Sequence, residues 1–178
     1  SGTDYQKLAN WADKAGQDHN ATPAVAFRQP TIRAGQISGR PTLKLLIFDQ
    51  NQSLALPTIN QVRTCFRVIE RGDLNHNQAT SLDGGSNQWG THQYHRISNA
   101  EDGNLQGLQR RDGEVVNFNE IGSFKSELQV ITVRTSDFVS AQIIGKKQGD
   151  GGYFHGKYAE ILIYDRPLST SEIETVEQ

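Results

Sequence analysis

Short runs of β-branched and aromatic residues, each bounded by turn residues, constrain the fold of this chain most. Apolar and polar residues alternate within these runs, as in strands of a packed sheet. The predicted strands span Ala24–Phe27, Thr42–Phe48, Ser53–Leu56, Thr64–Ile69, Val115–Phe118, Glu127–Val133, Ala141–Ile144 and Lys157–Tyr164. Eight or more short strands joined by turns favour two antiparallel sheets packed face to face. We therefore expect an all-β, two-sheet antiparallel β-sandwich (jelly roll) forming one domain over residues 1–178.

The strand Lys157–Tyr164 is followed directly by a turn and a short helix. Alternate residues from Ala159 to Ile163 form an apolar face and the other face is mixed, which predicts a strand covered on one side only. Pro167 ends the strand because it has no amide hydrogen to donate.

The start of the C-terminal helix carries a capping signal. Ser169 and Glu172 have the spacing of a capping box, and Leu168 is placed to pack against Ile173 across it. The spacing predicts a short helix from Thr170 towards Glu177.

These C-terminal residues resemble the signature of laminin-G-like domains, which belong to the concanavalin A-like lectin/glucanase superfamily. The matching residues are Gly156, Ala159, Glu160, Ile161, Leu162, Ile163, Tyr164, Asp165, Arg166, Leu168, Ser169 and Glu172. Nearer the N-terminus, Trp11, Asp13 and Gly16, the pair Phe48-Asp49, and Leu54 with Leu56 are similar to further motifs of the family. The resemblance implies a jelly-roll fold and an extracellular or cell-surface location, for instance in an adhesin.

The composition of the chain limits the classes of function that it can have. The net charge is -2, so the chain lacks the basic footprint of a nucleic-acid-binding domain. No apolar run approaches the ~20 residues of a membrane-spanning helix. The chain contains no methionine, and we expect it to be a module of a longer protein. Its one cysteine, Cys65, lies within a predicted strand, and we interpret it as a packed structural residue.

The long polar segment between residues 74 and 111 contains the main candidate binding site. Aromatic rings stand there beside hydrogen-bonding side chains, as a sugar with a CH-rich face and a rim of hydroxyls requires. The candidate ligand-binding residues are Asp83, Asn87, Trp89, His92, Tyr94, His95 and Arg96. The alternative interpretation is that Trp89 and Tyr94 cap the core and that the polar residues satisfy loop backbone.

A second glycine-rich loop, residues 145 to 156, contains Asp150-Gly151-Gly152 followed by Tyr153, Phe154 and His155. Tyr153 and His155 are further ligand-binding candidates, unless this is a hairpin turn whose aromatic side chains pack under the sheet rim. Because many laminin-G-like domains hold calcium at a loop edge, Asp83 and Asp150 are the candidate calcium ligands. If both Asp-Gly-Gly turns meet at one end of the fold, they would frame a shallow cleft.

Two other chemistries fit the sequence poorly. His92 and His95 point to opposite sides of an extended strand, and no third ligand stands at a zinc spacing. Retaining glycoside hydrolysis needs two carboxylates ~5–5.5 Å apart, and the acidic residues show no pattern that would place them on one face. Short segments look superficially like alginate-lyase motifs, but Gln129 and Ile144 stand where that family has an arginine and a histidine.

The sequence therefore favours a non-catalytic, lectin-like carbohydrate-binding module of a larger secreted or cell-surface protein, with no enzymatic activity. Its expected partners are a glycan or polysaccharide and neighbouring domains of the parent chain, with no nucleic acid and no membrane insertion. The alternative is a structural or protein-binding β-sandwich, and a glycan-active enzyme is the third and least favoured possibility.

Overall fold

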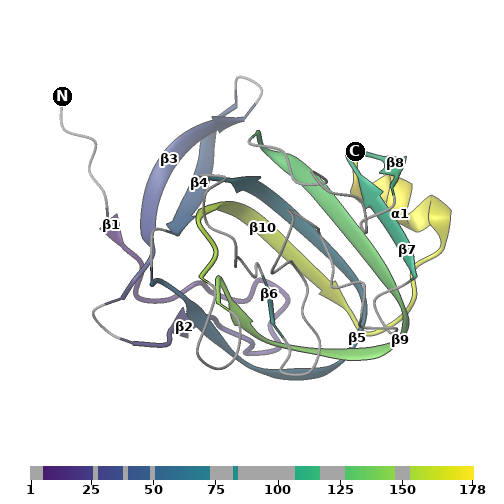
Figure 1. Ribbon diagram of the computed structural model, residues 1–178, viewed down its shortest axis with the longest axis horizontal. Helices are drawn as coiled ribbons and strands as arrows, with labels where there is room; N and C mark the ends of the chain where they lie inside the picture. The colour runs from purple at the N-terminus through teal and green to yellow at the C-terminus, as the bar shows by residue number, and fades with distance from the viewer. Residues whose placement is uncertain are drawn as a thin grey trace.

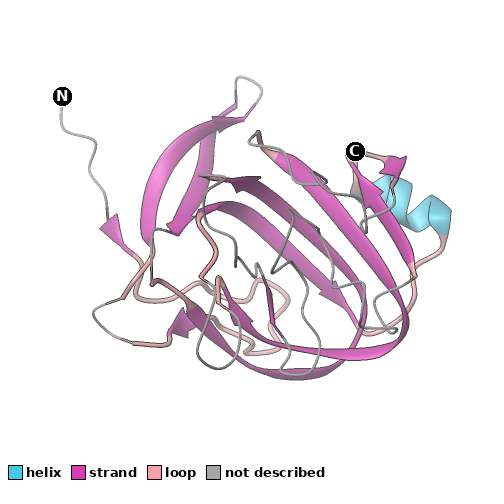
Figure 2. Ribbon diagram, in the orientation of Figure 1, coloured by secondary structure: helices cyan, strands magenta, loops and turns pink. Residues whose placement is uncertain are grey.

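The computed structural model describes residues 6–25, 28–37, 40–48, 51–72, 82–83, 107–116, 127–146 and 153–178. These ranges contain strands β1 (Gln6–Lys7), β2 (Thr22–Pro23), β3 (Thr31–Ile37), β4 (Arg40–Phe48), β5 (Leu54–Arg71), β6 (Leu82–Asp83), β7 (Leu108–Arg111), β8 (Glu114–Val115), β9 (Gln129–Ile144) and β10 (Gly156–Tyr164), and helix α1 (Thr170–Val176). All the strand pairs are antiparallel, so the all-β prediction with a short C-terminal helix is confirmed (Figure 2).

Two long, bent strands, β5 and β9, organise the sheet (Figure 1). Its hydrogen-bonded order is β1-β3-β4-β10-β5-β9-β7-β8, with β2 added to β5 and β6 added to β9. We divide the sheet into two arms. The long arm contains the second half of β5, the first half of β9, and strands β10, β4, β3, β1, β7 and β8. The other halves of β5 and β9 form the short arm with β2 and β6. The bend turns the two arms towards each other.

The bend coincides with a series of register shifts between β5 and β9. The shifts fall between Ala55 and Ile59, between Ile59 and Val62, and between Val62 and Thr64. Pro57 lies at the first shift and has no amide hydrogen for the ladder. Bulges of this kind bend a strand and increase its twist. We infer that the sequence around Pro57 is what allows β5 to belong to both arms.

The core lies between the two arms. The short arm contributes Leu54, Leu82 and Ile144, and the long arm contributes Phe48, Ile69, Tyr158 and Ile131 among others, all at most 3% exposed. At ~25 cal/mol per Å² of buried apolar surface, a large side chain of this kind contributes about 2 kcal/mol. The facing arms therefore hold each other through one shared apolar cluster.

Helix α1 covers the outer face of the long arm. Phe66, Leu168 and Ile173 form a second buried cluster there, with Leu162 and Tyr164 of β10 packed against it. The Ser169 hydroxyl accepts a hydrogen bond from the Glu172 amide, and the Glu172 carboxylate accepts one from the Ser169 amide. The predicted capping box and the predicted Leu168–Ile173 contact are confirmed.

A buried ion pair fastens the end of the helix to the sheet. Arg110 Nη2 of β7 lies 3.0 Å from Glu177 Oε2, and the two side chains are 8% and 6% exposed. Arg110 Nε also donates to the same carboxylate, and the Thr132 hydroxyl of β9 donates to Glu177 Oε1 at 2.6 Å. At the other end of the helix, Arg134 Nη1 donates to the Leu168 carbonyl. The helix is thus held to the sheet at both ends.

The prediction that the last strand is covered on one side only is wrong. A register shift between Tyr158 and Glu160 moves Tyr158 to the core face, where Ile161 and Ile163 also pack. Leu162 and Tyr164 pack on the opposite face under helix α1. The bulge changes the alternation, and the helix supplies the second cover.

Several predicted strand boundaries also differ. Ser53–Leu56 and Thr64–Ile69 are parts of one strand, β5, and Glu127–Val133 and Ala141–Ile144 fall largely within β9. The predicted strand Ala24–Phe27 is not a strand in its described part: β2 ends at Pro23, the Ala24 amide makes one more hydrogen bond to the Ser53 carbonyl, and the Val25 carbonyl then accepts from the Arg28 amide in a turn. β8 ends at Val115, earlier than predicted. No helix in the described ranges is long and apolar enough to cross a membrane.

We predict that Glu177→Ala lowers the free energy of unfolding by about 3 kcal/mol, because it leaves the Arg110 guanidinium buried without this carboxylate. Glu174→Ala is the matched control. Glu174 is 54% exposed and 3.8 Å from the same guanidinium, so its loss should change stability by less than ~1 kcal/mol. Urea unfolding measures both variants, and equal losses would contradict the role given to Glu177.

A second prediction concerns acid stability. Hydrogen bonds from Arg166 and Ser169 hold the pKa of Glu172 at about 2, below its ordinary value of 4.5. Because the folded-state pKa is lowered, the stabilisation is fully present above pH 4.5 and is lost as pH falls towards 2. Glu172→Gln retains a capping side chain but not the charge. The Tm advantage of the wild type over this variant should therefore disappear on acidification, and a constant difference would refute the assignment.

Candidate functional site

The structure describes only part of the predicted binding site. Tyr153 and His155 are described with their side chains, and Asp83 is described as part of β6 through its backbone alone. The other predicted site residues lie outside the described ranges: Asn87, Trp89, His92, Tyr94, His95, Arg96 and Asp150. The site is therefore built here from the second predicted loop, which ends at Tyr153, Phe154 and His155.

The strands of the short arm place that loop at one rim of the fold. Pro23 of β2 pairs with Leu54 of β5, Leu54 pairs with Ile144 of β9, and Ile144 pairs with Leu82 of β6. Asp83 pairs with Ile143, and because the pairing is antiparallel, β6 runs from Leu82, opposite the last residue of β9, back along β9 to Asp83. The second predicted loop begins just after β9, at Gly145. The structure thus places the two residues of β6 beside the last two residues of β9, and the second loop begins at that rim.

At this rim, two cationic side chains interact with the side chain of Tyr153. Arg28, in the connection between β2 and β3, donates a hydrogen bond from Nη1 to the Tyr153 hydroxyl at 3.0 Å. The Lys146 ammonium lies 5.3 Å from the centre of the Tyr153 ring, within the range of a cation–π interaction. We call Arg28, Lys146 and Tyr153 the Tyr153 cluster. All three side chains are half-buried, so each is held by the protein and still reaches solvent.

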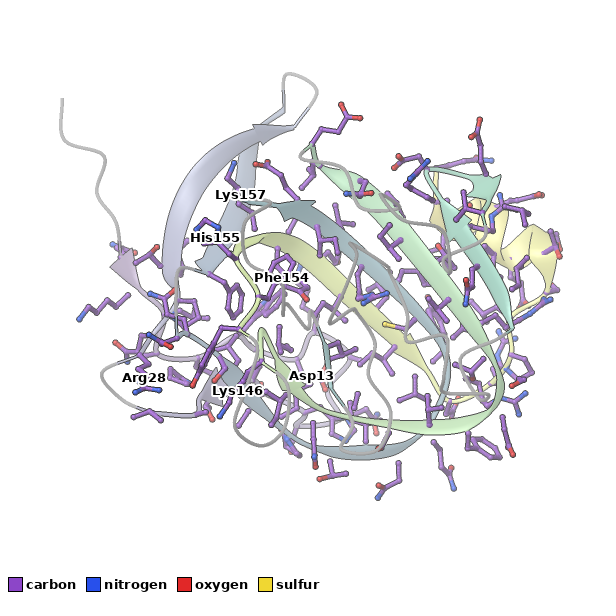
Figure 3. The ribbon with its side chains drawn as sticks, viewed as in Figure 1. Asp13, Arg28, Lys146, Phe154, His155 and Lys157 are labelled. Carbon is purple, nitrogen blue, oxygen red and sulfur yellow. The ribbon has the colours of Figure 1, made fainter. Side chains whose placement is uncertain are left out.

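The backbone under the cluster is fixed by pairing and by a buried aromatic anchor. Lys146 and Tyr153 form an isolated β-bridge, and the Phe154 amide donates to the Gly145 carbonyl at 2.8 Å. The Phe154 ring is 1% exposed and packs edge-on against Tyr158 and Phe48, with ring centres 5.1 and 6.4 Å away. The two neighbouring residues therefore have different roles, because Phe154 (Figure 3) is buried in the core and Tyr153 is half-buried.

One of the two interpretations of the second loop, packing under the sheet rim, holds for one of its residues, and the ligand-binding interpretation stays a prediction. Packing under the rim describes Phe154, which is buried, while Tyr153 and His155 are half-buried. His155 lies beside Gly72, whose amide donates to the His155 carbonyl at 2.9 Å. An added Cβ at Gly72 would lie 2.6 Å from His155 Nδ1, so the imidazole is closely packed. Further along β10, Lys157 forms an ion pair with Glu70.

The Trp-x-Asp-x-x-Gly segment, Trp11 to Gly16, lies in a loop whose backbone amides donate to the side chain of its own aspartate. The Asp13 carboxylate accepts hydrogen bonds from the amides of Ala15, Gln17 and His19. The hydrogen bond from Ala15, reinforced by those from His19 and Gln17, lowers the pKa of Asp13. Trp11 closes the loop by exchanging two backbone hydrogen bonds with Ala21 and packs against the core. This motif is structural in the protein, because its carboxylate is occupied by its own loop.

Cys65 is structural, as the sequence predicted. It is 0% exposed in the core, and burial raises the pKa of its thiol to about 11. Reactive cysteines are thiolates, which require the opposite shift. Arg67, two residues along on the same face of β5, is also fully buried, and burial lowers the pKa of its guanidinium.

Sequence reasoning missed Arg28 and Lys146. Neither belongs to a recognisable motif, and Arg28 is 125 residues from Tyr153 along the chain. The one sequence signal for Lys146 was its position at the start of the glycine-rich loop that contains the binding candidates Tyr153 and His155. As for metals, the described ranges contain no group of three or more His, Cys, Asp or Glu side chains placed to hold an ion.

We predict that Gly145→Ala disrupts the support of the Tyr153 cluster. Gly145 has φ of +83°, and an added Cβ would lie 2.5 Å from the buried Phe48 ring. Overpacking costs about 1–3 kcal/mol beyond the ~1–2 kcal/mol cost of the left-handed backbone. Gly16→Ala is the control, since Gly16 has φ of +74° with nothing within 4 Å. Chemical denaturation should show the larger loss for Gly145→Ala, and a larger loss for Gly16→Ala would contradict the packing argument.

Comparison with known proteins assigns no relative to this chain: no family model, no curated protein and no solved structure matches it significantly. Function is therefore argued from the residues and contacts described above.

Proposed function

We propose that this chain is a non-catalytic carbohydrate-binding module with a laminin-G-like jelly roll, carried by a larger secreted or cell-surface protein. The fold part of the proposal is supported by the facing arms of the bent antiparallel sheet and the capped C-terminal helix on its outer face. The segments that carry the resemblance to laminin-G-like domains each form a defined local structure. The Trp11–Gly16 segment forms a closed loop, and residues 156 to 172 form the last strand and the helix cap.

The observation that carries the binding part of the proposal is the Tyr153 cluster. A half-buried aromatic ring at a rim gives the CH-rich face of a sugar a surface to stack on. Arg28 and Lys146 place N–H donors beside that ring for the sugar hydroxyls. The bridge and the buried Phe154 hold these groups before any ligand arrives, which reduces the ordering cost of binding.

In this proposal the other predicted loop completes the site. Asp83 lies beside Ile143 of β9. The segment that follows Asp83 supplies the further sugar contacts, which are Asn87, Trp89, His92, Tyr94, His95 and Arg96. His155 completes the second loop's contribution. Calcium, held by Asp83 and Asp150, is proposed as an optional part of the site and is tested by chelation.

We predict that Tyr153→Ala weakens glycan binding about tenfold or more, because it removes the stacking surface. Tyr153→Phe keeps the ring but loses the hydroxyl that accepts from Arg28, so it should retain part of the affinity. Phe138→Ala is the matched control, since Phe138 is a 50% exposed aromatic residue on β9 outside the cluster. A glycan array read with calcium and again with a chelator identifies the ligand, and titration with that ligand compares the variants.

Selective binding that Tyr153→Ala loses and Phe138→Ala keeps would support the proposed site. Binding lost on chelation would add calcium to it. Binding that both variants retain would move the site away from Tyr153. Absence of binding to any glycan in both conditions would refute the carbohydrate proposal and favour a structural or protein-binding module.

A further inference from the structure

Two segments of the chain have the Asn-x-Ser/Thr spacing at which a secretory pathway attaches an oligosaccharide to asparagine. They are Asn20-Ala21-Thr22 and Asn51-Gln52-Ser53, and both lie in described parts of the structure. An attached oligosaccharide is bulky and hydrated, so it requires an asparagine side chain that faces solvent in the folded protein. The two asparagines differ in this respect.

Asn20 is part of a closed loop. Its side-chain oxygen accepts a hydrogen bond from the Asp13 amide at 2.8 Å, and the residue is half-buried. Ala21, the next residue, is 2% exposed and exchanges two backbone hydrogen bonds with Trp11. An oligosaccharide on the Asn20 amide would have to fit beside the backbone of this loop.

The contacts that hold Asn20 are also local in the sequence. A loop of about ten residues closes in ~10–100 ns, whereas synthesis adds only ~5–20 residues per second. The hydrogen bond to Asp13 and the bridge between Trp11 and Ala21 can therefore form while the rest of the chain is still being made. The loop thus limits access to Asn20 both during synthesis and after folding.

Asn51, by contrast, is an exposed residue in a turn. Its φ of +68° is a left-handed conformation, which asparagine adopts more readily than most residues. The strand that follows begins at Leu54, whose partner in β9 is Ile144 and is synthesised much later. Asn51 therefore precedes a strand that can pair only late in synthesis, and its side chain still faces solvent in the folded protein.

We propose that Asn51 is an N-glycosylation site of this protein and that Asn20 is not. This inference rests on the secreted or cell-surface location in the proposed function. The donor is an oligosaccharide linked to a lipid pyrophosphate. A bond forms between Asn51 Nδ2 and C1 of the first sugar, and the bond from C1 to the pyrophosphate oxygen breaks. The amide nitrogen loses one proton, the lipid pyrophosphate leaves, and nothing is oxidised or reduced.

The experiment secretes the whole chain from yeast cells behind a cleavable signal peptide. The secreted protein is treated with peptide N-glycosidase, which releases the oligosaccharide and leaves aspartate in place of the modified asparagine. The change in electrophoretic mobility shows whether the protein was glycosylated, and mass spectrometry of its peptides locates the converted residue.

Two pairs of variants assign the site. Asn51→Gln and Asn20→Gln remove the acceptor amides. Ser53→Ala and Thr22→Ala remove the hydroxyl of each motif and leave its asparagine unchanged, so they test the same sites without altering the turn at Asn51 or the hydrogen bond to Asp13. Urea unfolding confirms that each secreted variant is folded.

We expect glycosidase treatment to shift the wild type, Asn20→Gln and Thr22→Ala, and to leave Asn51→Gln and Ser53→Ala unshifted. Aspartate should replace Asn51 alone in the treated wild type. A shift lost in the Asn20 and Thr22 variants instead would reverse the assignment. Modification of both asparagines, or of neither, in the folded secreted protein would also overturn it. None of these readouts requires glycan binding, so the glycan array tests the proposed carbohydrate-binding function separately.

Discussion

The pairing of β5 with β9 is the constraint on which the rest of the structure depends. Both strands continue through a bend and are therefore members of both arms of the sheet. The three register shifts allow the bend without ending the ladder, since each shift places extra residues in one of the two strands and so bends it. Because the arms share these strands, the apolar cluster between them can form only when the bend is correct.

On the outer face of the long arm, polar groups are buried, and their hydrogen-bond partners offset the free-energy cost of removing them from water. Glu177 meets two donors of Arg110 and the hydroxyl of Thr132, so the buried carboxylate is satisfied from two strands. Burying a carboxylate without such partners would lower the free energy of unfolding by roughly several kcal/mol. Thr64 is used in the same way, since its hydroxyl donates to the Arg166 carbonyl and accepts from the Leu168 amide.

The proposed binding site follows from this architecture. The short arm collects the ends of β2, β5, β9 and β6 at one rim, and the core beneath it holds Phe48, Phe154 and Tyr158 in edge-on contacts. Phe154 is the link between core and rim, because burying its ring fixes the neighbouring Tyr153. A rigid scaffold that presents half-exposed side chains from its connecting segments is the usual basis for specific recognition.

The sequence by itself determined the local features of this protein. The capping box, the Leu168–Ile173 contact, the strands β4 and β10 and the structural role of Cys65 depend on residues close together in the chain, where spacing and propensity decide the outcome. Only the tertiary structure decided which face of β10 receives Tyr158, because a bulge reverses the alternation that sequence reasoning assumes. It also decided that Arg28 meets Tyr153 across 125 residues. That contact depends on strand pairing far from both residues, which no local pattern encodes.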